Sequence, residues 1–278
     1  MIGLRNNYLL IVFDSCRYDT FVEAKPKVMR RLGKPQQRWS YASWTSPSHF
    51  NMLTGLLPHE SPKGVYASEY YRRDFLKFND RLGGEGIKFE SLVPRLYLPP
   101  FLQSLGYKTH ARVSLPVLNP NTILNDGFDS YKLMECHNDF RAILSEVKFS
   151  EEHPSFYLLN VGETHYPYAL VDEPRGSWPT LSGVHGVFKH MDHHTIGGKI
   201  RRTTFNRGKL DELRARQVAA VRFLDSAMES LFDEAPKNTY ITITSDHGEL
   251  FGEDGYFGHG PIQHPKVFEV PFVEGKIR

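Results

Sequence analysis

Three short apolar segments of the chain each end abruptly in polar residues: 8–13, 156–161 and 240–244. Apolar runs of this length without polar alternation are typical of strands buried on both faces, as in a parallel sheet covered by helices. Catalytic and binding groups of such sheets lie beyond the carboxyl ends of the strands. The polar residues found there are Asp14, His165, Asp246 and His247. Any one of them could be a capping Asp or a hydrogen-bonded turn His, but their coincidence favours a site.

The segments between these runs predict helices that alternate with strands. Helical spacing or helix-start and helix-stop signals mark residues 20–32, 46–55, 98–106 and 209–232, and residues 107–113 predict a further strand. This alternation indicates an α/β protein, a three-layer α/β/α sandwich with a mostly parallel central sheet. We expect a single domain over residues 1–278, with variable insertions near 58–95 and 172–208 on the substrate side.

Composition narrows the function classes. The 278 residues are 40% apolar and 24% charged with a formal net charge of +2, which argues against a general nucleic-acid binder but suits a small anionic substrate. No apolar run approaches the roughly 20 residues of a membrane span, and no signal-peptide core is visible. Two cysteines, Cys16 and Cys136, make no disulfide framework. We therefore expect a cytoplasmic protein without stable membrane insertion; the oligomeric state is not predicted.

The Asp246-His247 pair predicts a metal ligand set. A hard oxygen ligand beside an imidazole nitrogen suits an ion of the zinc or manganese class. The segment SWTSPSHFNMLTG at 43–55 adds a hydroxyl residue, Thr45, immediately before a proline-bearing helix start. The free N–H groups and positive dipole end of such a helix stabilise a nearby oxyanion, although an ordinary capping Thr or Ser is the simpler interpretation.

The chain resembles the alkaline-phosphatase superfamily, specifically its sulfatase-like branch, over nearly its whole length. FDSCRYD is similar to the first metal-binding turn of that family, and TSPSHFNMLTG aligns with its C-x-P-x-R…T-G signature. TSDHGELFGEDG is the most recognisable shared segment. Further similar segments are LPPFLQSLGYKT, NDGFDSY, GETHYPY and KVFEVPF. The resemblance implies the alkaline-phosphatase-like fold and a metal-assisted enzyme acting on phosphate or sulfate esters.

Departures from the sulfatase pattern favour phosphorus over sulfur. Thr45 stands where sulfatases carry the Cys or Ser that becomes formylglycine, and a threonine cannot give that aldehyde. Family members with Thr at this position are similar to phosphoryl-transfer enzymes, namely phosphoethanolamine and phosphoglycerol transferases and phosphodiesterases. The chain resembles these members more than the sulfatases. His49 replaces the signature arginine, and Ser15 replaces the second aspartate of the first turn. The alternatives are a sulfuric ester hydrolase without formylglycine and a catalytically silent binding relative.

The resemblance implies a role for each candidate residue. Asp14, Asp246 and His247 would bind one divalent ion, zinc or manganese, with Thr45 as fourth ligand and as the nucleophile that becomes a phosphothreonine. His165 and His259 would contact phosphoryl oxygens or protonate the leaving oxygen. His49 and Arg17 are candidate substrate-binding residues, and Arg17 could equally brace Asp14. A second ion could use Glu163, His165 and His259, but the Asp-x-x-x-His motif of two-metal relatives is missing, which favours one ion.

Two further clusters have weaker interpretations. The histidines between 185 and 194 lack a fixed ligand spacing, so a solvated loop is favoured over a metal site. Residues 199–216 carry a local charge of +5, from seven cationic and two acidic side chains. This segment is either a solvated helix start or a rim that attracts a phosphorylated substrate.

Overall fold

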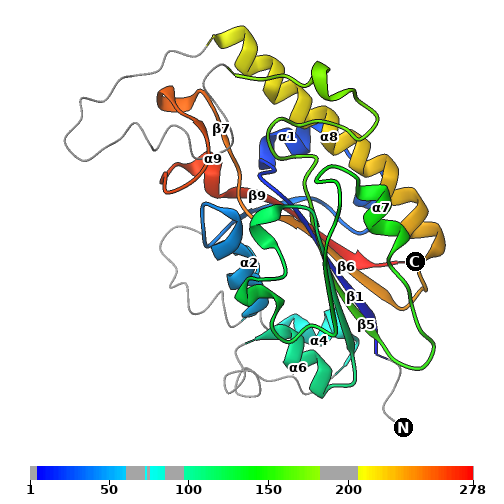
Figure 1. Cartoon of the computed structure of the whole chain (residues 1–278). Coiled ribbons are helices and arrows are strands. Elements are labelled where there is room, and N and C mark those ends of the chain that lie inside the picture. The colour runs from blue at the N-terminus through cyan, green and yellow to red at the C-terminus, as the bar shows by residue number, and fades with distance from the viewer. Residues whose placement is uncertain (1–4, 61–72, 74–75, 85–96, 182–205, 278) are drawn as a thin grey trace.

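The computed structural model describes residues 5–60, 73, 76–84, 97–181 and 206–277. At its centre lies a seven-stranded sheet in the order β2-β9-β6-β1-β5-β3-β4 (Figure 1). Five strands run parallel: β1 (Asn7–Phe13), β3 (Lys108–Val113), β4 (Ser130–Leu133), β5 (Ser155–Val161) and β6 (Thr239–Ser245). At one side β9 (Glu269–Lys276) pairs antiparallel with β6, and β2 (Gln36–Trp39) pairs antiparallel with β9.

Helices cover both faces of this sheet, as Figure 1 shows. One face carries α1 (Tyr18–Ala24), α7 (Phe140–Ser145) and the long α8 (Arg207–Glu234). The other carries α2 (Thr45–Leu53), α4 (Phe78–Leu82) and α6 (Leu98–Ser104). A two-stranded sheet of β7 (Leu250–Phe251) and β8 (Phe257–Gly258) and the short α9 (Pro265–Phe268) follow β6.

The central strand explains why its sequence is apolar without alternation. Leu9, Ile11 and Phe13 of β1 pack into the hydrophobic core beneath α1, α7 and α8. Tyr8, Leu10 and Val12, on the opposite face of the same strand, pack into the core beneath α2, α4 and α6. Because successive side chains of a strand point to opposite faces, a strand between two helical layers must be apolar at every position. The predicted three-layer α/β/α fold is confirmed.

The predicted helix at 20–32 is wrong in its length. The helix α1 ends at Ala24, and Lys25 takes the left-handed conformation with φ 55°. Pro26 follows, and a proline disfavours helical geometry in the residue before it. The chain resumes only as a single 3₁₀ turn, Met29–Arg31. Asp225 of α8 accepts the N–H groups of Lys27, Val28 and Met29, which replaces the missing helical partners.

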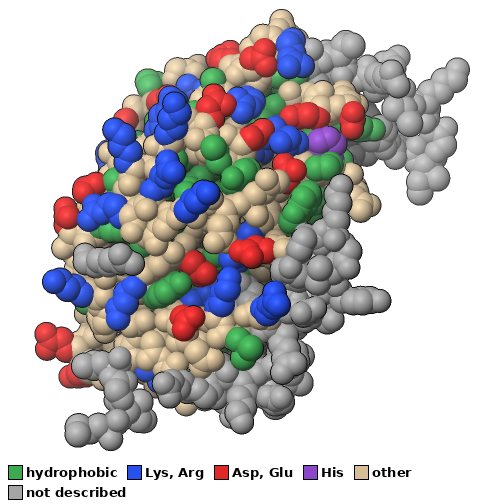
Figure 2. All heavy atoms as spheres, turned by 180° about the vertical axis from the view of Figure 1, so that it is seen from behind, with side chains coloured by type: hydrophobic (Ala, Val, Ile, Leu, Met, Phe, Trp, Pro, Cys, Tyr) green, Lys and Arg blue, Asp and Glu red, His purple; other side chains and the backbone are tan. Residues whose placement is uncertain are grey.

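Most of the two predicted insertions lies outside the described residues. Of 58–95, the structure describes 58–60, 73 and 76–84, which include α4. Of 172–208, it describes 172–181 and 206–208, so the histidine cluster at 185–194 lies outside them. No helix among the described residues is both long and apolar enough to cross a lipid bilayer. Seen from behind, the described surface mixes Lys and Arg with Asp and Glu, in keeping with a net charge near zero (Figure 2).

One buried side chain fastens α8 to the ends of the central strands. The Gln217 amide donates to the carbonyl oxygens of Ser15 and Thr164 at 2.9 and 3.0 Å. Its Oε1 accepts from the Arg17 N–H at 3.3 Å and from Thr20 Oγ1 at 2.6 Å. The glutamine is fully buried, so these four groups form hydrogen bonds with its side chain and not with water.

We expect Gln217→Ala to destabilise the protein by about 2–4 kcal/mol, because the change removes a buried side chain and leaves buried polar groups unpaired. Urea unfolding measures the difference. The matched control is Arg222→Ala on the exposed side of the same helix, with an expected effect within about 0.5 kcal/mol. Equal effects of the two changes would contradict a fastening role for Gln217.

Candidate active site

Two buried carboxylates meet at the ends of neighbouring parallel strands. Phe13 of β1 is in register with Ser245 of β6, so Asp14 and Asp246 are the next residue of each strand. Both side chains are fully buried. The Ser15 N–H donates to Asp246 Oδ1 at 3.0 Å, which ties the two strand ends together. This arrangement is the strand-end convergence that the sequence predicted.

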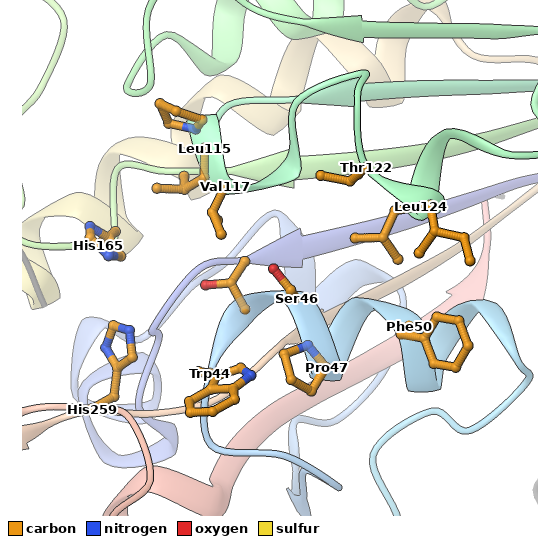
Figure 3. A pocket seen from close by; sticks show the side chains of 13 residues that line it. Trp44, Ser46, Pro47, Phe50, Leu115, Val117, Thr122, Leu124, His165 and His259 are labelled. Carbon is orange, nitrogen blue, oxygen red and sulfur yellow. The ribbon is translucent and has the colours of Figure 1, made fainter. Parts of the chain in front are cut away.

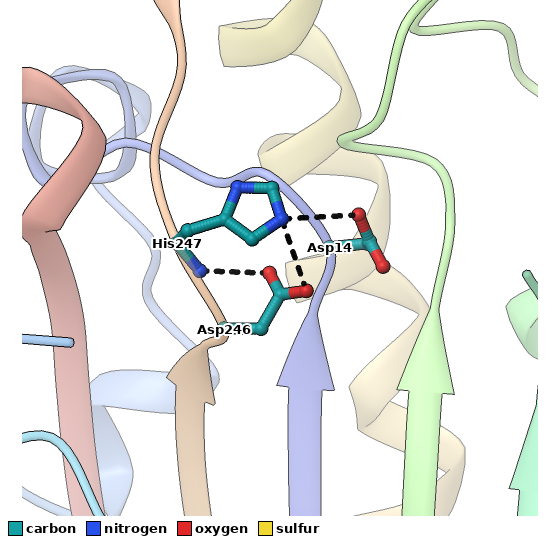
Figure 4. A group of neighbouring side chains, drawn as sticks. All are labelled: Asp14, Asp246 and His247. Carbon is teal, nitrogen blue, oxygen red and sulfur yellow. Dashed lines mark hydrogen bonds and ion pairs between the residues drawn. The ribbon is translucent and has the colours of Figure 1, made fainter. Parts of the chain in front are cut away.

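His247 completes the group (Figure 4). Its Nδ1 lies 2.9 Å from the Gly248 carbonyl, which can only accept, so Nδ1 carries a proton. The other ring nitrogen, Nε2, lies 3.3 Å from Asp246 Oδ2 and 4.0 Å from Asp14 Oδ1. Gly248 must be glycine, since a Cβ there would lie 2.1 Å from the Lys266 carbonyl oxygen.

The three groups shift one another's ionisation in the metal-free protein. Burial raises the pKa of Asp14, and the neighbouring Asp246 carboxylate raises it further. Burial also opposes ionisation of Asp246, but the His247 ring outweighs it and lowers the pKa of Asp246 to about 2. Burial works against a charged His247, yet the two carboxylates raise its pKa to about 9. An imidazolium therefore serves as the counter-charge when no metal is bound.

The same three residues fit a divalent cation. One ligand atom from each of Asp14, Asp246 and His247 lies within 4.8 Å of the others, and this is the one such group among the described residues. Asp246 Oδ2 is buried and makes no hydrogen bond, and its contact with His247 Nε2 at 3.3 Å is an ion pair only. A buried carboxylate oxygen that is incompletely paired costs free energy, and a cation between these groups would remove that cost. Two carboxylates and an imidazole with a fixed tautomer are ligands that zinc and manganese accept.

Thr45 lies beside this group at the start of α2. Its Oγ1 is 3.4 Å from His247 Nε2, and the residue is 6% exposed. The residue that caps the helix is Trp44, without a side-chain hydrogen bond, so the alternative of Thr45 as an ordinary capping residue is wrong. Thr45 is the first helical residue, where backbone N–H groups have no partner within the helix. Its hydroxyl therefore faces His247 and does not cap the helix.

Asn160, at the end of β5, links Asp14 to the helix that carries Thr45. Its Oδ1 accepts the Ser114 and Leu115 N–H groups at 3.1 Å each, which fixes the orientation of the amide. Its Nδ2 then donates to Asp14 Oδ2 at 3.1 Å and faces His49 Nε2 at 3.4 Å. Because Nδ2 can only donate, His49 accepts at Nε2 and is neutral.

His49 is not placed as a substrate contact. The residue is 1% exposed, and its Nδ1 donates to the Thr45 carbonyl oxygen at 2.9 Å. Both ring nitrogens thus face protein groups beneath α2. The contacts give His49 a positioning role for the Thr45 backbone in place of the predicted contact with substrate.

His165 and His259 line the pocket that opens at Thr45 (Figure 3). Their ring centroids are 5.6 Å apart, and the His259 ring is 4.1 Å from that of His247. His165 Nδ1 donates to the Tyr166 carbonyl at 2.8 Å, which leaves Nε2 free of that bond. Burial, with His247 and His165 nearby, lowers the pKa of His259 well below its usual value, so this ring is neutral in the metal-free protein.

The side chain of Arg17 pairs with carboxylates other than Asp14 and Asp246. Its guanidinium forms ion pairs with Asp19 at 2.6 Å and Glu253 at 2.5 Å and donates to the Glu249 carbonyl. These contacts fasten the β6–β7 loop, through Glu249, and the β7–β8 turn, through Glu253, to the turn after β1. Neither of the two predicted roles, pairing with a substrate anion or bracing the Asp14 carboxylate, matches them.

One carboxylate oxygen of Glu163 accepts a backbone hydrogen bond. Its Oε1 accepts the Phe140 N–H at the start of α7, at 2.7 Å, and burial raises its pKa to about 8. The described residues therefore offer no second ligand group around Glu163, His165 and His259.

The model of the Sulfatase family matches residues 6–273. The chain belongs to the Sulfatase family. No curated protein matches the sequence. This family match confirms the sulfatase-like resemblance predicted from the motifs. Three solved structures share the fold of the chain at low sequence identity.

The first of these structures is the C-terminal periplasmic domain of EcEptC from Escherichia coli in complex with Zn, with 12% identity, a TM-score of 0.61, and coverage of 99% of this chain and 74% of that chain. The soluble domain of lipooligosaccharide phosphoethanolamine transferase A from Neisseria meningitidis has 12% identity, a TM-score of 0.55, and coverage of 99% and 78%. A putative sulfatase from Bacteroides thetaiotaomicron has 15% identity, a TM-score of 0.56, and coverage of 97% and 64%.

The sequence did not point to two polar residues of this Sulfatase-family site. Asn160 is hidden inside an apolar run, where its polarity was the only available signal. Glu249 is fully buried, accepts a hydrogen bond from Tyr168 Oη, and places Oε2 3.4 Å from His259 Nδ1. Burial raises the pKa of Glu249 to about 8. An acidic residue directly after Asp246-His247-Gly248 was visible in the sequence, but its partner His259 is ten residues away.

The raised pKa of Glu163 predicts a pH-dependent stability. The Glu163 carboxyl has a pKa of about 8 in the folded protein and an ordinary value of 4.5, so the folded state binds its proton more tightly. Its contribution to the free energy of unfolding is therefore fully present below pH 4.5 and is lost as pH rises through 8. The pKa of Glu249, raised to about 8, and that of His247, raised from 6.5 to about 9, act in the same direction. The free energy of unfolding of chelator-treated protein should therefore fall by several kcal/mol between pH 5 and 9, since each unit of pKa shift corresponds to about 1.4 kcal/mol.

Glu163→Gln should reduce the slope of this profile between pH 5 and 8, because glutamine still accepts the Phe140 N–H but cannot ionise, while Glu249 and His247 still contribute. Urea unfolding at each pH gives the profile. Glu234→Gln, at an exposed position of α8, is the control and should leave the slope unchanged. A slope equal to wild type in Glu163→Gln would refute the assignment.

Proposed function

We propose that the protein is a metal-dependent hydrolase or transferase acting on phosphate esters or phosphonates, with Thr45 as nucleophile. The observation that carries this proposal is the position of Thr45 Oγ1, 3.4 Å from His247 Nε2 and therefore beside the Asp14–Asp246–His247 group. Family membership supports an enzyme of this class. The zinc complex of EcEptC supports a zinc ion, with manganese as the alternative.

The residues of the chain divide the chemistry between them. The bond from Thr45 Oγ1 to phosphorus forms as the bond from phosphorus to the leaving oxygen breaks. His259, neutral in its buried position, accepts the Thr45 proton. The imidazolium form of His165, with its Nδ1 proton on the Tyr166 carbonyl, donates its Nε2 proton to the leaving oxygen and becomes neutral. The resulting phosphothreonine passes its phosphoryl group to water in a hydrolase or to an alcohol in a transferase.

The positions of these groups are set by hydrogen bonds within the chain. Glu249 lies against His259 Nδ1 and, with the proton on that nitrogen, leaves Nε2 for the reacting groups. His49 holds the Thr45 carbonyl, and Asn160 holds Asp14. A divalent ion held by Asp14, Asp246 and His247 would lower the pKa of a ligated hydroxyl and polarise a phosphoryl oxygen.

A sulfuric ester hydrolase is the second candidate, because the matching family is named for sulfatases. Thr45 argues against it, since threonine cannot be converted to the aldehyde of formylglycine. The predicted substrate is a small phosphorylated anion, and the predicted location is the cytoplasm. The catalytically silent alternative is disfavoured because a binding protein has no chemical need for both the ligand group and an adjacent hydroxyl.

A panel of chromogenic esters tests the reaction. With zinc or manganese added, we expect turnover of 4-nitrophenyl phosphate, bis(4-nitrophenyl) phosphate or 4-nitrophenyl phenylphosphonate in preference to 4-nitrophenyl sulfate. Thr45→Ala should reduce kcat at least about 100-fold, because the nucleophile is lost, and Thr45→Ser should retain activity. Thr54→Ala, beyond the end of the same helix, is the control.

Mass spectrometry of the protein quenched during turnover should show a phosphoryl group on Thr45. Wild-type turnover in Thr45→Ala would exclude the mechanism, and turnover of the sulfate ester alone would favour the second candidate.

Equilibrium dialysis with Zn²⁺ and with Mn²⁺ tests the ligand set separately from turnover. Wild-type protein should bind a single ion, and Asp246→Asn should weaken binding by more than the roughly 10- to 100-fold loss that removal of an outer-shell partner causes. Asp211→Asn, an exposed carboxylate on α8, is the control. Unchanged metal affinity in Asp246→Asn would remove Asp246 from the ligand set.

A further inference from the structure

A pocket of about 740 Å³ begins at the candidate nucleophile and continues between two apolar walls (Figure 3). The first wall is the start of α2, with Trp44, Pro47 and Phe50. The second is the segment after β3, with Leu115, Val117 and Ile123. Thr45, His165 and His259 line one part of the same space, so the walls are continuous with the candidate site.

More than half of the exposed large hydrophobic residues on the described surface lie in these two walls. Four of the seven exposed large hydrophobic residues line this one pocket: Trp44 at 36%, Phe50 at 43%, Val117 at 45% and Ile123 at 67%. Exposed apolar residues scattered singly need no explanation, but a contiguous group beside reactive residues marks a binding site.

The pocket also lacks a partner for a charged substituent. Among the described residues that line it there is no Lys, Arg, Asp or Glu. The polar side-chain groups are the hydroxyls of Thr45, Ser46 and Thr122, the two imidazoles and the indole N–H of Trp44. A sugar or an ionic headgroup would find few hydrogen-bond partners along the walls, whereas a hydrocarbon group would lose water on both sides.

We propose that these walls bind an uncharged hydrocarbon substituent of the substrate, an alkyl or aryl group attached to the reacting phosphoryl group. The inference rests on the proposed function, because it places the phosphoryl end at Thr45. Phe50 is five residues beyond Thr45, about 7.5 Å along the helix axis, so the wall spans the length of a phenyl ring or of about six methylenes. The substrate is an ester or phosphonate of a small apolar alcohol or aryl group.

A series of n-alkylphosphonates from methyl to octyl tests this subsite, because the phosphorus–carbon bond resists hydrolysis. Calorimetric titration of the zinc-loaded protein, below the micelle concentration of each probe, gives Kd. We expect Kd to fall about two- to fourfold per methylene up to roughly hexyl and then to level off, since a fully buried methylene contributes about fourfold.

Val117→Asp and Ile123→Asp should abolish the dependence of Kd on chain length, because a carboxylate on the wall keeps its water and cannot pack against an alkyl chain. Both positions are exposed, so the variants should fold, and Val117→Leu should keep the dependence. Val22→Asp, an exposed apolar residue of α1 outside the pocket, is the control. A Kd independent of chain length, or a dependence that survives both aspartates, would overturn the proposal.

Two further results separate this subsite from the proposed function. Thr45→Ala should lose turnover and keep the chain-length dependence, so failure of the Thr45 mechanism leaves this test intact. Binding to phosphatidylcholine vesicles that is lost in Val117→Asp and Ile123→Asp, with no chain-length dependence, would make the walls a membrane contact and refute the substrate subsite.

Discussion

The repulsion between the buried carboxylates of Asp14 and Asp246 is the constraint around which the site is organised. Adjacent parallel strands in register bring both groups to one point, where burial denies them water. Such a pair is tolerated only with a positive charge nearby. In the metal-free protein the imidazolium of His247 supplies that charge. In a metal-bound protein the cation would supply it.

The supporting contacts come from separate parts of the chain. Gln217 fastens the long helix α8 to the turns after β1 and β5, and Arg17 fastens the β6–β7 loop to the same turn after β1. These contacts lie on the α1–α8 side of the sheet, while Asn160 and His49 connect to α2 on the other. A preorganised site of this kind needs rigid elements on both sides, which a three-layer fold provides.

The sequence predicted the parts of the site that follow from strand ends. Asp14, Asp246 and His247 come directly after buried strands, so the parallel sheet alone brings them together, and Thr45 follows from a helix-start signal. The roles of Arg17 and His49 could not be predicted in the same way. Each has a local partner, Asp19 for Arg17 and the Thr45 carbonyl for His49. Their other partners, Glu253 and Asn160, lie more than 100 residues away in the chain, and nothing local marks those pairings. The end of α1 at Ala24 differs from the predicted 20–32 because Pro26 disfavours helical geometry at Lys25.

Asn160 connects the position of the second pocket wall to the position of Asp14. Its Oδ1 holds the backbone at Ser114 and Leu115, where the second pocket wall begins, while its Nδ2 holds Asp14. The wall and the ligand group therefore share one fixed reference point. Side chains beyond Leu115 can change without moving Asp14, so selectivity for the organic substituent can diverge while the reactive centre stays constant. Insertions at the anchored backbone itself would disturb both at once, and we expect relatives to differ in length beyond it.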